Sequence, residues 1–290
     1  MKKLLVPFFI VSACHLFGQS LHFSTANVHS HNDYKQKIPF WLAYNEGFGS
    51  MEVDIFLQDG ELLVAHENKE LVNHRTLEEY YLRNLQLCMK KNGNHPFADT
   101  SRKLQVLIDI KTDSLSTLEK LVEILKKYPL LINNPSLTFV ITGRRPEASR
   151  LADYPPFIYF DGVLSKTYSR KALAKIVLLS DDFKTYSQWN GMGPLPVKER
   201  AVLQSAVDKA HRLLKPVRFW NAPDFINAWN QFMNLGVDYI NTDRIADIST
   251  FLQGLRKTIY FSGAANDVFI SQHIKTARTL IHQDNKFPLP

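Results

Sequence analysis

Short runs of apolar residues recur along the chain, and amphipathic stretches separate most of them. Runs of four to eight residues rich in Val, Ile, Leu and Phe are typical of strands buried in a parallel sheet. Strands that alternate with helices indicate parallel βαβ units, and eight such strands predict a (β/α)₈ TIM barrel. The predicted strands span residues 26–31, 50–57, 104–111, 136–142, 157–163, 176–180, 217–221 and 239–242.

The segments between these strands carry signals of helix ends. Two capping boxes, in which Thr or Ser precedes Glu by three residues, predict helix starts at Thr76 and Ser116. Pro146 and Pro223 suit the first turn of a helix, and Gly236 suits the position just after one. Amphipathic stretches predict further helices over residues 197–214, 224–235 and 267–283.

The second predicted strand carries two acidic residues on one face. Glu52 and Asp54 alternate with apolar Met51, Val53 and Ile55. Residues two apart in a strand point to the same side, so the two carboxylates lie together. Carboxylates on an inner face are costly unless a positive group neutralises them, and a hard divalent cation is the usual partner. We therefore interpret Glu52 and Asp54 as metal ligands.

A hairpin is expected to return a histidine to this strand. Asp59 and Gly60 lie between two apolar runs, which indicates a tight turn between antiparallel strands. The returning strand ends at His66, close to the carboxylate pair. His29 and His31 end the first predicted strand. These histidines could act as acid and base beside the metal ligands.

The other candidate residues also follow predicted strands, at the end where a (β/α)₈ barrel places its site. Asp109 stands alone in an apolar run, where an unpaired acid is unfavourable, so we interpret it as a third ligand. This oxygen ligand set favours Ca²⁺ or Mg²⁺ over Zn²⁺. Lys111, on the same face, suits a salt bridge to the acids. Pocket-shaping roles are predicted for Arg144, Trp220 and Asp243.

These motifs together resemble a known superfamily, the phosphatidylinositol-specific phospholipase C-like phosphodiesterases, which include the glycerophosphodiester phosphodiesterases. The motifs similar to their catalytic half are residues 31–34, Glu52 with Asp54, and His66. Residues 217–221 and 235–244 resemble the last two barrel strands of the glycerophosphodiesterases. The variant at residues 30–34 looks closest to a bacterial and fungal branch related to the yeast altered inheritance of mitochondria 6 protein.

The resemblance implies roles for individual residues. The eukaryotic phospholipase pattern makes His31 catalytic and Asn32 a metal ligand, whereas the glycerophosphodiesterase register makes His29 the catalytic histidine. We take His31 first and keep His29 as the alternative, since both share one strand face; Asn32 also suits a simple turn. The resemblance further implies that Lys111 contacts the phosphate. Asp109 is shorter than the Glu common in the family, so a bridging water is an alternative to direct ligation.

Charge and the amino-terminal segment bear on partners and location. The formal net charge of +7 favours an anionic substrate, while no dense run of Lys and Arg indicates nucleic acid. A basic start and the apolar run 4–13 predict an export signal over residues 1–19. Cys14 suits a lipobox, which gives lipid anchoring as the alternative to ordinary cleavage. We expect a periplasmic or extracellular protein, with one domain over residues 20–290.

The sequence therefore predicts an exported, metal-dependent phosphoric diester hydrolase. In the resembling enzymes, a substrate hydroxyl next to the phosphate attacks first and gives a cyclic phosphate. A glycerophosphodiester or a phosphoinositide-like lipid is the expected substrate, with contact to a membrane surface in the lipid case. Two alternatives remain open, a metal-dependent phosphomonoesterase and a non-catalytic binding protein on a decayed barrel. The sequence does not indicate the substrate head group or the oligomeric state.

Overall fold

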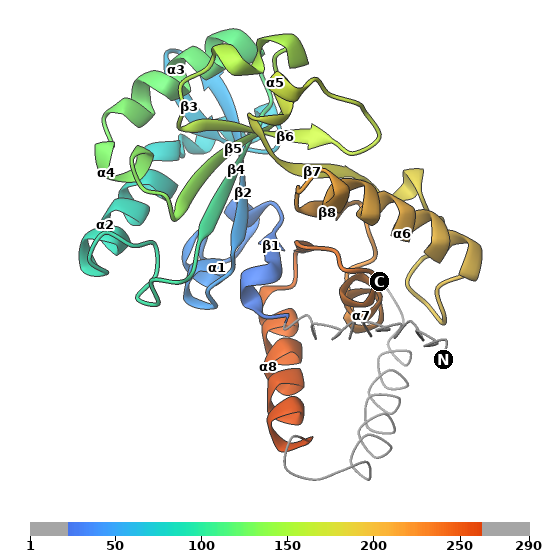
Figure 1. The fold of residues 1–290 in the computed structure, drawn as a ribbon. Coiled ribbons are helices and arrows are strands. Elements are labelled where there is room, and N and C mark those ends of the chain that lie inside the picture. Colours follow the sequence, from blue (N-terminus) through green and yellow to red (C-terminus); the bar gives the residue numbers. More distant parts are fainter. Residues whose placement is uncertain (1–22, 263–290) are drawn as a thin grey trace, which may run out of the picture.

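A parallel sheet forms the centre of the computed structural model, which describes residues 23–262 (Figure 1). Its eight parallel strands follow the order β8-β7-β6-β5-β4-β2-β1-β9, and β3 pairs with β2 from the side. The strands are β1 (Val28–Ser30), β2 (Ser50–Gln58), β3 (Glu61–Val64), β4 (Leu104–Ile110), β5 (Leu137–Gly143), β6 (Ile158–Val163), β7 (Ile176–Asp182), β8 (Val217–Trp220) and β9 (Ile240–Thr242).

The two ends of this strand order meet and close the barrel. A parallel bridge joins Arg218 of β8 to Tyr239, just before β9, and the Tyr239 amide donates to the Val217 carbonyl at 3.2 Å. Among the described residues, this isolated bridge is the only strand pairing across the seam, whereas β4 pairs with β5 over its whole length and with β2 from Gln105 to Ile110. The predicted (β/α)₈ fold is therefore confirmed, with one weakly paired seam.

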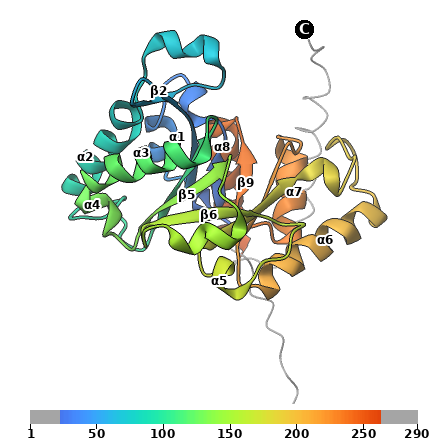
Figure 2. The ribbon, with the colours of Figure 1, turned by 90° about the horizontal axis from the view of Figure 1, so that it is seen from above.

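Helices surround the barrel, as seen from above in Figure 2. They are α1 (Trp41–Asn45), α2 (Arg83–Lys91), α3 (Ser114–Lys126), α4 (Pro129–Ile132), α5 (Arg170–Leu173), α6 (Val197–Arg212), α7 (Ile226–Leu235) and α8 (Ile245–Ser262). A short 3₁₀ helix, Ala148–Asp153, connects β5 to β6. Between residues 23 and 262, no helix combines the length and apolarity needed to cross a bilayer.

Side chains alternate between two environments along each strand. Outward-facing residues join the helices in one apolar core, to which β4 contributes Val106 and Ile108. Inside the barrel, Leu107, Val140 and Leu178 form a smaller apolar cluster. Glu52 pairs with Leu107, and Asp54 and Asp109 lie two residues further toward the carboxyl ends of β2 and β4 on the same inner face.

The predicted hairpin is present, and helix ends differ from expectation. Strands β2 and β3 pair antiparallel around Asp59 and Gly60, which both have positive φ. Helix α3 is capped by Asp113, whose carboxylate accepts from the Ser116 amide at 3.0 Å. The predicted helix start at Ser116 was wrong, because the Asp113 carboxylate caps the helix three residues earlier by accepting from the Ser116 amide. Gly236 ends α7 with φ +77° as predicted.

Other helix starts were predicted less well. A turn of π-helix, Glu78–Leu82, separates Thr76 from α2, although the Thr76 hydroxyl accepts from the Glu79 amide at 3.2 Å. Pro146 and Pro223 lie in the connections before the helical segments, since proline also suits extended backbone. Helix α8 was not predicted. The expected signal at 1–19 and the helix predicted at 267–283 lie outside the described residues.

Candidate active site and metal-binding cluster

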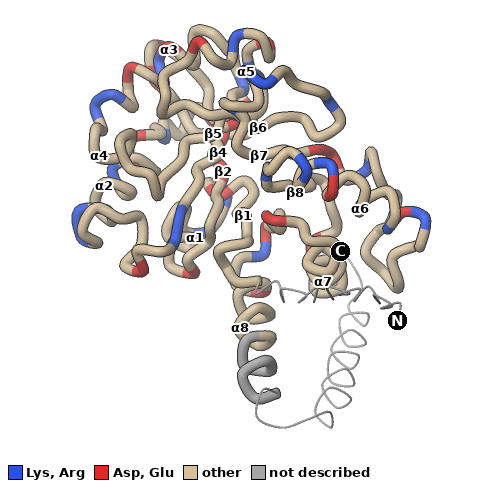
Figure 3. The backbone as a smooth tube through the Cα atoms, viewed as in Figure 1, with Lys and Arg blue, Asp and Glu red and all other residues tan. Residues whose placement is uncertain are grey.

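Three carboxylates meet inside the barrel at the carboxyl ends of β2 and β4. Asp54 and Asp109 are direct neighbours in the pairing of these strands, and Glu52 lies two residues before Asp54. One oxygen from each of the three lies within 4.8 Å of the others. Figure 3 shows acidic positions on β2 and β4 near the barrel axis, while many Lys and Arg lie on the outer helices and loops. The three residues form a candidate metal site.

The oxygens of this cluster are arranged as a cation would require. Oδ1 of Asp54 and Oδ1 of Asp109 are buried and accept no hydrogen bond within the described part of the chain. Gly143 leaves the space beside Asp109 open, since a Cβ there would lie 1.9 Å from Oδ1. Buried carboxylate oxygens without donors are costly, so these residues fit a hard divalent cation.

Lys111 binds the outer oxygens of two of these acids. Its Nζ lies 2.9 Å from Asp54 Oδ2 and 3.1 Å from Asp109 Oδ2, so the predicted salt bridge is present. Burial and the neighbouring Asp54 charge raise the pKa of Asp109 to about 6. Burial alone would lower the pKa of Lys111, but the two carboxylates outweigh it and raise that pKa. Lys111 therefore stays charged at the edge of the cluster.

His66 is oriented by Asp54 and by a residue that the sequence did not single out. His66 Nδ1 lies 3.1 Å from Asp54 Oδ2, and the Tyr34 hydroxyl donates to the same oxygen at 2.8 Å. Because a carboxylate accepts, Nδ1 carries the hydrogen and Nε2 is free of this contact. The His66 side chain is 39% exposed. Tyr34 ends the motif that carries His31, which is the one sequence signal that could have identified it.

His31 is oriented by Asp243, from the turn after β9. Its Nδ1 lies 2.9 Å from Asp243 Oδ1, and its side chain is 31% exposed. Burial would lower the pKa of His31, but the hydrogen bond to Asp243 and the charges of Glu52 and Asp243 outweigh it, so the pKa is raised. The Asn32 amide nitrogen lies 3.2 Å from His31 Nε2, and the Asn32 Oδ1 atom lies 3.0 Å from the Tyr34 hydroxyl. A metal role for Asn32 stays a prediction.

His29 occupies a different environment below the cluster. It is fully buried, with Nε2 2.8 Å from Glu52 Oε2 and Nδ1 2.6 Å from Ser50 Oγ. Burial, followed by the Arg218 charge, lowers the pKa of His29 to about 3. Burial also opposes ionisation of Glu52, but Arg218 and His29 outweigh it and hold the pKa of Glu52 below its usual range. His29 is therefore neutral beside an ionised Glu52.

Arg218 was missed by the sequence reasoning although its strand was recognised. Its Nη1 donates to Glu52 Oε2 at 2.7 Å, and its Nη2 lies 3.8 Å from buried Asp161. A single Arg in an apolar strand carries no signal for partners more than fifty residues away. Arg144 and Trp220 are exposed at the ends of β5 and β8, so their substrate contacts stay predictions.

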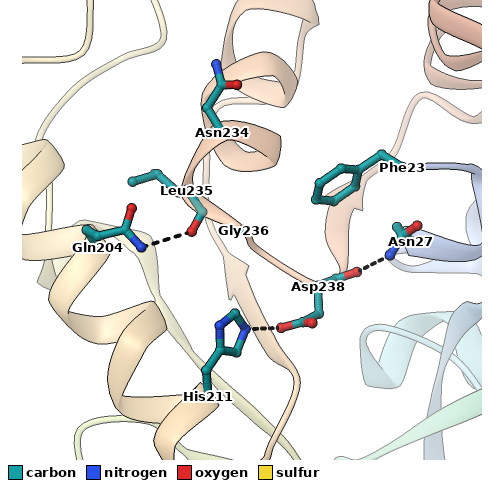
Figure 4. Close-up of a pocket in the computed structure, with 8 residues that line it drawn as sticks. All are labelled: Phe23, Asn27, Gln204, His211, Asn234, Leu235, Gly236 and Asp238. Carbon is teal, nitrogen blue, oxygen red and sulfur yellow. Dashed lines mark hydrogen bonds and ion pairs between the residues drawn. The ribbon is translucent and has the colours of Figure 1, made fainter. Parts of the chain in front are cut away.

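A separate cavity of about 390 Å³ lies at the opposite end of the barrel (Figure 4). Asn27 and Asp238, which line it, come just before β1 and β9, so the cavity lies at the amino ends of the strands. It contains a His211–Asp238 pair with 2.8 Å between Nε2 and Oδ2. The carboxylate cluster and the two oriented histidines all lie at the other end.

Comparisons with known proteins match the two segments of the chain that carry most of these residues. Residues 20–130 match the AIM6-like phosphodiesterase domain, and residues 216–244 match the glycerophosphoryl diester phosphodiesterase family. The first match contains the three carboxylates and both exposed histidines, and the second contains Arg218 and Asp243. These matches confirm the resemblance to the phospholipase C-like phosphodiesterase superfamily, in its branch related to AIM6.

Relatives in the AIM6-related branch extend over most of this chain. The altered inheritance of mitochondria protein 6 homolog of Arthroderma benhamiae is 28% identical, over 75% of this chain and 81% of its own. The altered inheritance of mitochondria protein 6 of Kluyveromyces lactis is also 28% identical, over 78% of this chain and 72% of its own. A solved glycerophosphodiester phosphodiesterase from Parabacteroides distasonis is 14% identical with a TM-score of 0.47, covering 79% of this chain and 97% of that one.

Proposed function

We propose that this phosphodiesterase-family protein is a metal-dependent phosphoric diester hydrolase that acts on glycerophosphodiester or phosphoinositide-like substrates. The observation that carries the proposal is the pairing of two part-exposed histidines with carboxylates, His31 with Asp243 and His66 with Asp54, around one carboxylate cluster. A phosphodiester bond needs a proton removed from the attacking group and a proton supplied to the leaving group. Two oriented imidazoles match that need.

His31 and His66 are proposed as the acid–base pair. In each case a carboxylate holds Nδ1, which fixes the tautomer and turns Nε2 away from that carboxylate. Nε2 of His31 lies 3.2 Å from the Asn32 amide nitrogen, which a substrate would have to displace. His29 is fully buried, and both of its ring nitrogens have partners inside the barrel. Its burial favours His31 over His29 as the histidine that meets substrate.

Glu52, Asp54 and Asp109 are proposed to hold one divalent cation, Ca²⁺ or Mg²⁺, because all their donors are oxygens. Such a cation, when bound, neutralises a phosphodiester oxygen and lowers the pKa of an attacking hydroxyl or water. Lys111, at the part-exposed edge of the cluster, is proposed to contact a second phosphate oxygen. Arg144 and Trp220, at the rim, are proposed to contact the rest of the substrate.

Two other functions are compatible with the sequence. A non-catalytic barrel would be expected to have lost a catalytic histidine or a carboxylate, whereas all of these groups are present and mutually oriented. A phosphomonoesterase would use the same metal and histidines, so the choice between monoester and diester depends on substrate tests. The matches to two phosphodiesterase family models support a diester substrate.

A substrate panel tests the proposal. With Ca²⁺ or Mg²⁺ present, bis-p-nitrophenyl phosphate, p-nitrophenyl phosphate, glycerophosphodiesters and phosphatidylinositol are compared as substrates. We expect diesters to be cleaved at least about tenfold faster than the monoester, with a cyclic phosphate seen by phosphorus NMR when a hydroxyl adjoins the phosphate. A preference for the monoester would indicate a phosphomonoesterase. Tight binding of every diester without cleavage would indicate a binding protein.

A further inference from the structure

Glu52 is held from beneath the cluster by two buried side chains. His29 Nε2 lies 2.8 Å from its Oε2, and Arg218 Nη1 lies 2.7 Å from the same oxygen. Glu52 is 5% exposed, His29 is fully buried and Arg218 is 3% exposed. Within the described residues, the hydrogen bonds of Glu52 therefore fall on Oε2, and Oε1 is the oxygen left to a ligand.

The far side of the His29 ring is anchored in turn. Gln105 Nε2 donates to Ser50 Oγ at 2.9 Å, and Ser50 Oγ lies 2.6 Å from His29 Nδ1. Arg218 Nη1, which can only donate, also lies 2.6 Å from His29 Nε2. The ring is therefore held by Ser50 at Nδ1 and by Glu52 and Arg218 at Nε2. Gln105, Ser50 and His29 thus form a continuous row of contacts that ends at Glu52.

Arg218 is fixed by contacts to three other strands. Its Nε donates to Ser180 Oγ of β7 at 3.2 Å, and its Nη1 donates to Asn241 Oδ1 of β9 at 3.1 Å. Its Nη2 lies 3.8 Å from Asp161 Oδ2 of β6. A guanidinium with this many partners has little freedom to move, so the Glu52 carboxylate has a rigid support from β8 as well as from β1.

We infer that His29 is a positioning residue, which together with Arg218 fixes Oε2 of Glu52 so that Oε1 is offered to a divalent cation. The inference rests on the metal site of the proposed function and gives His29 a different role from His31 and His66. Groups that hold metal ligands in place typically change metal affinity or activity by about 10–100-fold when they are removed. Substitution of His29 should therefore weaken metal binding, while turnover by the metal-saturated protein is retained.

The test is metal binding by the His29→Gln variant. Ca²⁺ and Mg²⁺ are each titrated calorimetrically into chelator-treated wild-type and variant protein. We expect the variant to have a Kd for the better-bound ion raised by about 10–100-fold. Turnover of bis-p-nitrophenyl phosphate, lost at low metal concentration, should return as the variant is saturated with metal.

His211 offers a matched control at the other end of the barrel (Figure 4). It makes a His–carboxylate contact of the same length, 2.8 Å to Asp238, but it is about 43% exposed and far from the cluster in the fold. His211→Gln should leave the metal Kd unchanged. A similar rise in Kd in both variants would overturn the inference, because it would show a general loss of stability.

A catalytic His29 gives the opposite pattern, with an unchanged metal Kd and turnover at saturating metal lowered on the order of 10²-fold or more. That result would overturn the inference. If His29→Gln does not fold, Ser50→Ala loosens the same ring from Nδ1, and an unchanged Kd there would overturn it. If the wild type binds metal but cleaves no diester, the proposed function fails while the comparison of Kd values still decides the role of His29.

Discussion

At the scale of single residues, the two oxygens of each buried acid have different surroundings. Oδ2 of Asp54 contacts Lys111, Tyr34 and His66, whereas Oδ1 has no donor among residues 23–262. In the same part of the chain, Oδ2 of Asp109 contacts Lys111 and its Oδ1 has no partner. Without a cation these unpaired oxygens destabilise the folded protein. We therefore expect the metal-free protein to be less stable toward unfolding than the metal-bound protein.

The destabilising effect of the ionised Asp109 should appear in the pH dependence of the free energy of unfolding. Its pKa of about 6 in the folded protein exceeds the usual 3.8, so the folded state holds the proton more tightly than the unfolded chain. In EDTA, the tighter binding of this proton stabilises the folded protein by roughly 3 kcal/mol below about pH 4. This stabilisation should be lost as the pH rises through about 6. Urea unfolding of wild type and Asp109→Asn across this range measures it. An identical pH dependence in both would contradict the assignment.

The two proposed catalytic histidines should be separable by leaving group. His31→Ala and His66→Ala should each lower turnover of an alkyl phosphodiester on the order of 10²-fold or more, with the metal Kd retained. A p-nitrophenolate leaving group needs little protonation, so the variant that lacks the general acid should recover on it. Steady-state kinetics on both substrates measures this. Near-normal turnover by His31→Ala on both would show that His31 is not catalytic.

The residues that could be predicted from the sequence have a local signal. Glu52 and Asp54 are marked by alternation within one strand, and His66 by the hairpin that returns it. Tyr34 and Arg218 could not be predicted in this way, because their roles depend on contacts across the barrel. Arg218 contacts Glu52 across 166 positions of sequence, and no pattern within either strand predicts that contact.

At the scale of elements, the end of β5 limits what can stand beside Asp109. Gly143 has φ +67°, and a Cβ would approach Asp109 Oδ1 to 1.9 Å and the Ile110 carbonyl to 2.8 Å. Gly143→Ala should therefore weaken metal binding, because Asp109 must move. It should also destabilise by at least about 1 kcal/mol more than the backbone strain alone. Thermal unfolding and metal calorimetry are the measurements.

Gly60 supplies the control for that prediction. It also has positive φ, +80°, but nothing lies within 4 Å of a Cβ placed there. Gly60→Ala incurs a similar backbone cost without touching the cluster, so it should leave the metal Kd unchanged. If both alanine variants lowered metal affinity equally, the close approach at Gly143 would have no special role.

Element positions were predicted better than element ends. The strands follow from apolar runs, and Asp-Gly marks the β2–β3 turn. The cap of α3 was misplaced because Asp113 and Ser116 are both good caps, and only the fold decides between them. Helix α8 follows β9 without a capping box or proline, and its mixed polar and apolar sequence gave no clear start.

At the scale of the whole molecule, the barrel has one seam of low pairing between β8 and β9. The Tyr239 amide is held by a single contact across it, whereas Ile108 of β4 lies between two fully paired neighbours. Amides at the seam should open by local fluctuation, so we expect Tyr239 to exchange at least about tenfold faster than Ile108. Hydrogen exchange followed by NMR measures both. Equal protection would show that the seam is as stable as the rest of the barrel.

The central claim is that one cation on three carboxylates and two oriented histidines together cleave a phosphodiester. Its most direct test is turnover of bis-p-nitrophenyl phosphate by exhaustively chelated protein, followed during titration with Ca²⁺ and with Mg²⁺. We expect negligible turnover after chelation and full recovery on saturation with one of these ions, with half-recovery near the calorimetric Kd. Undiminished turnover after complete removal of metal would contradict it.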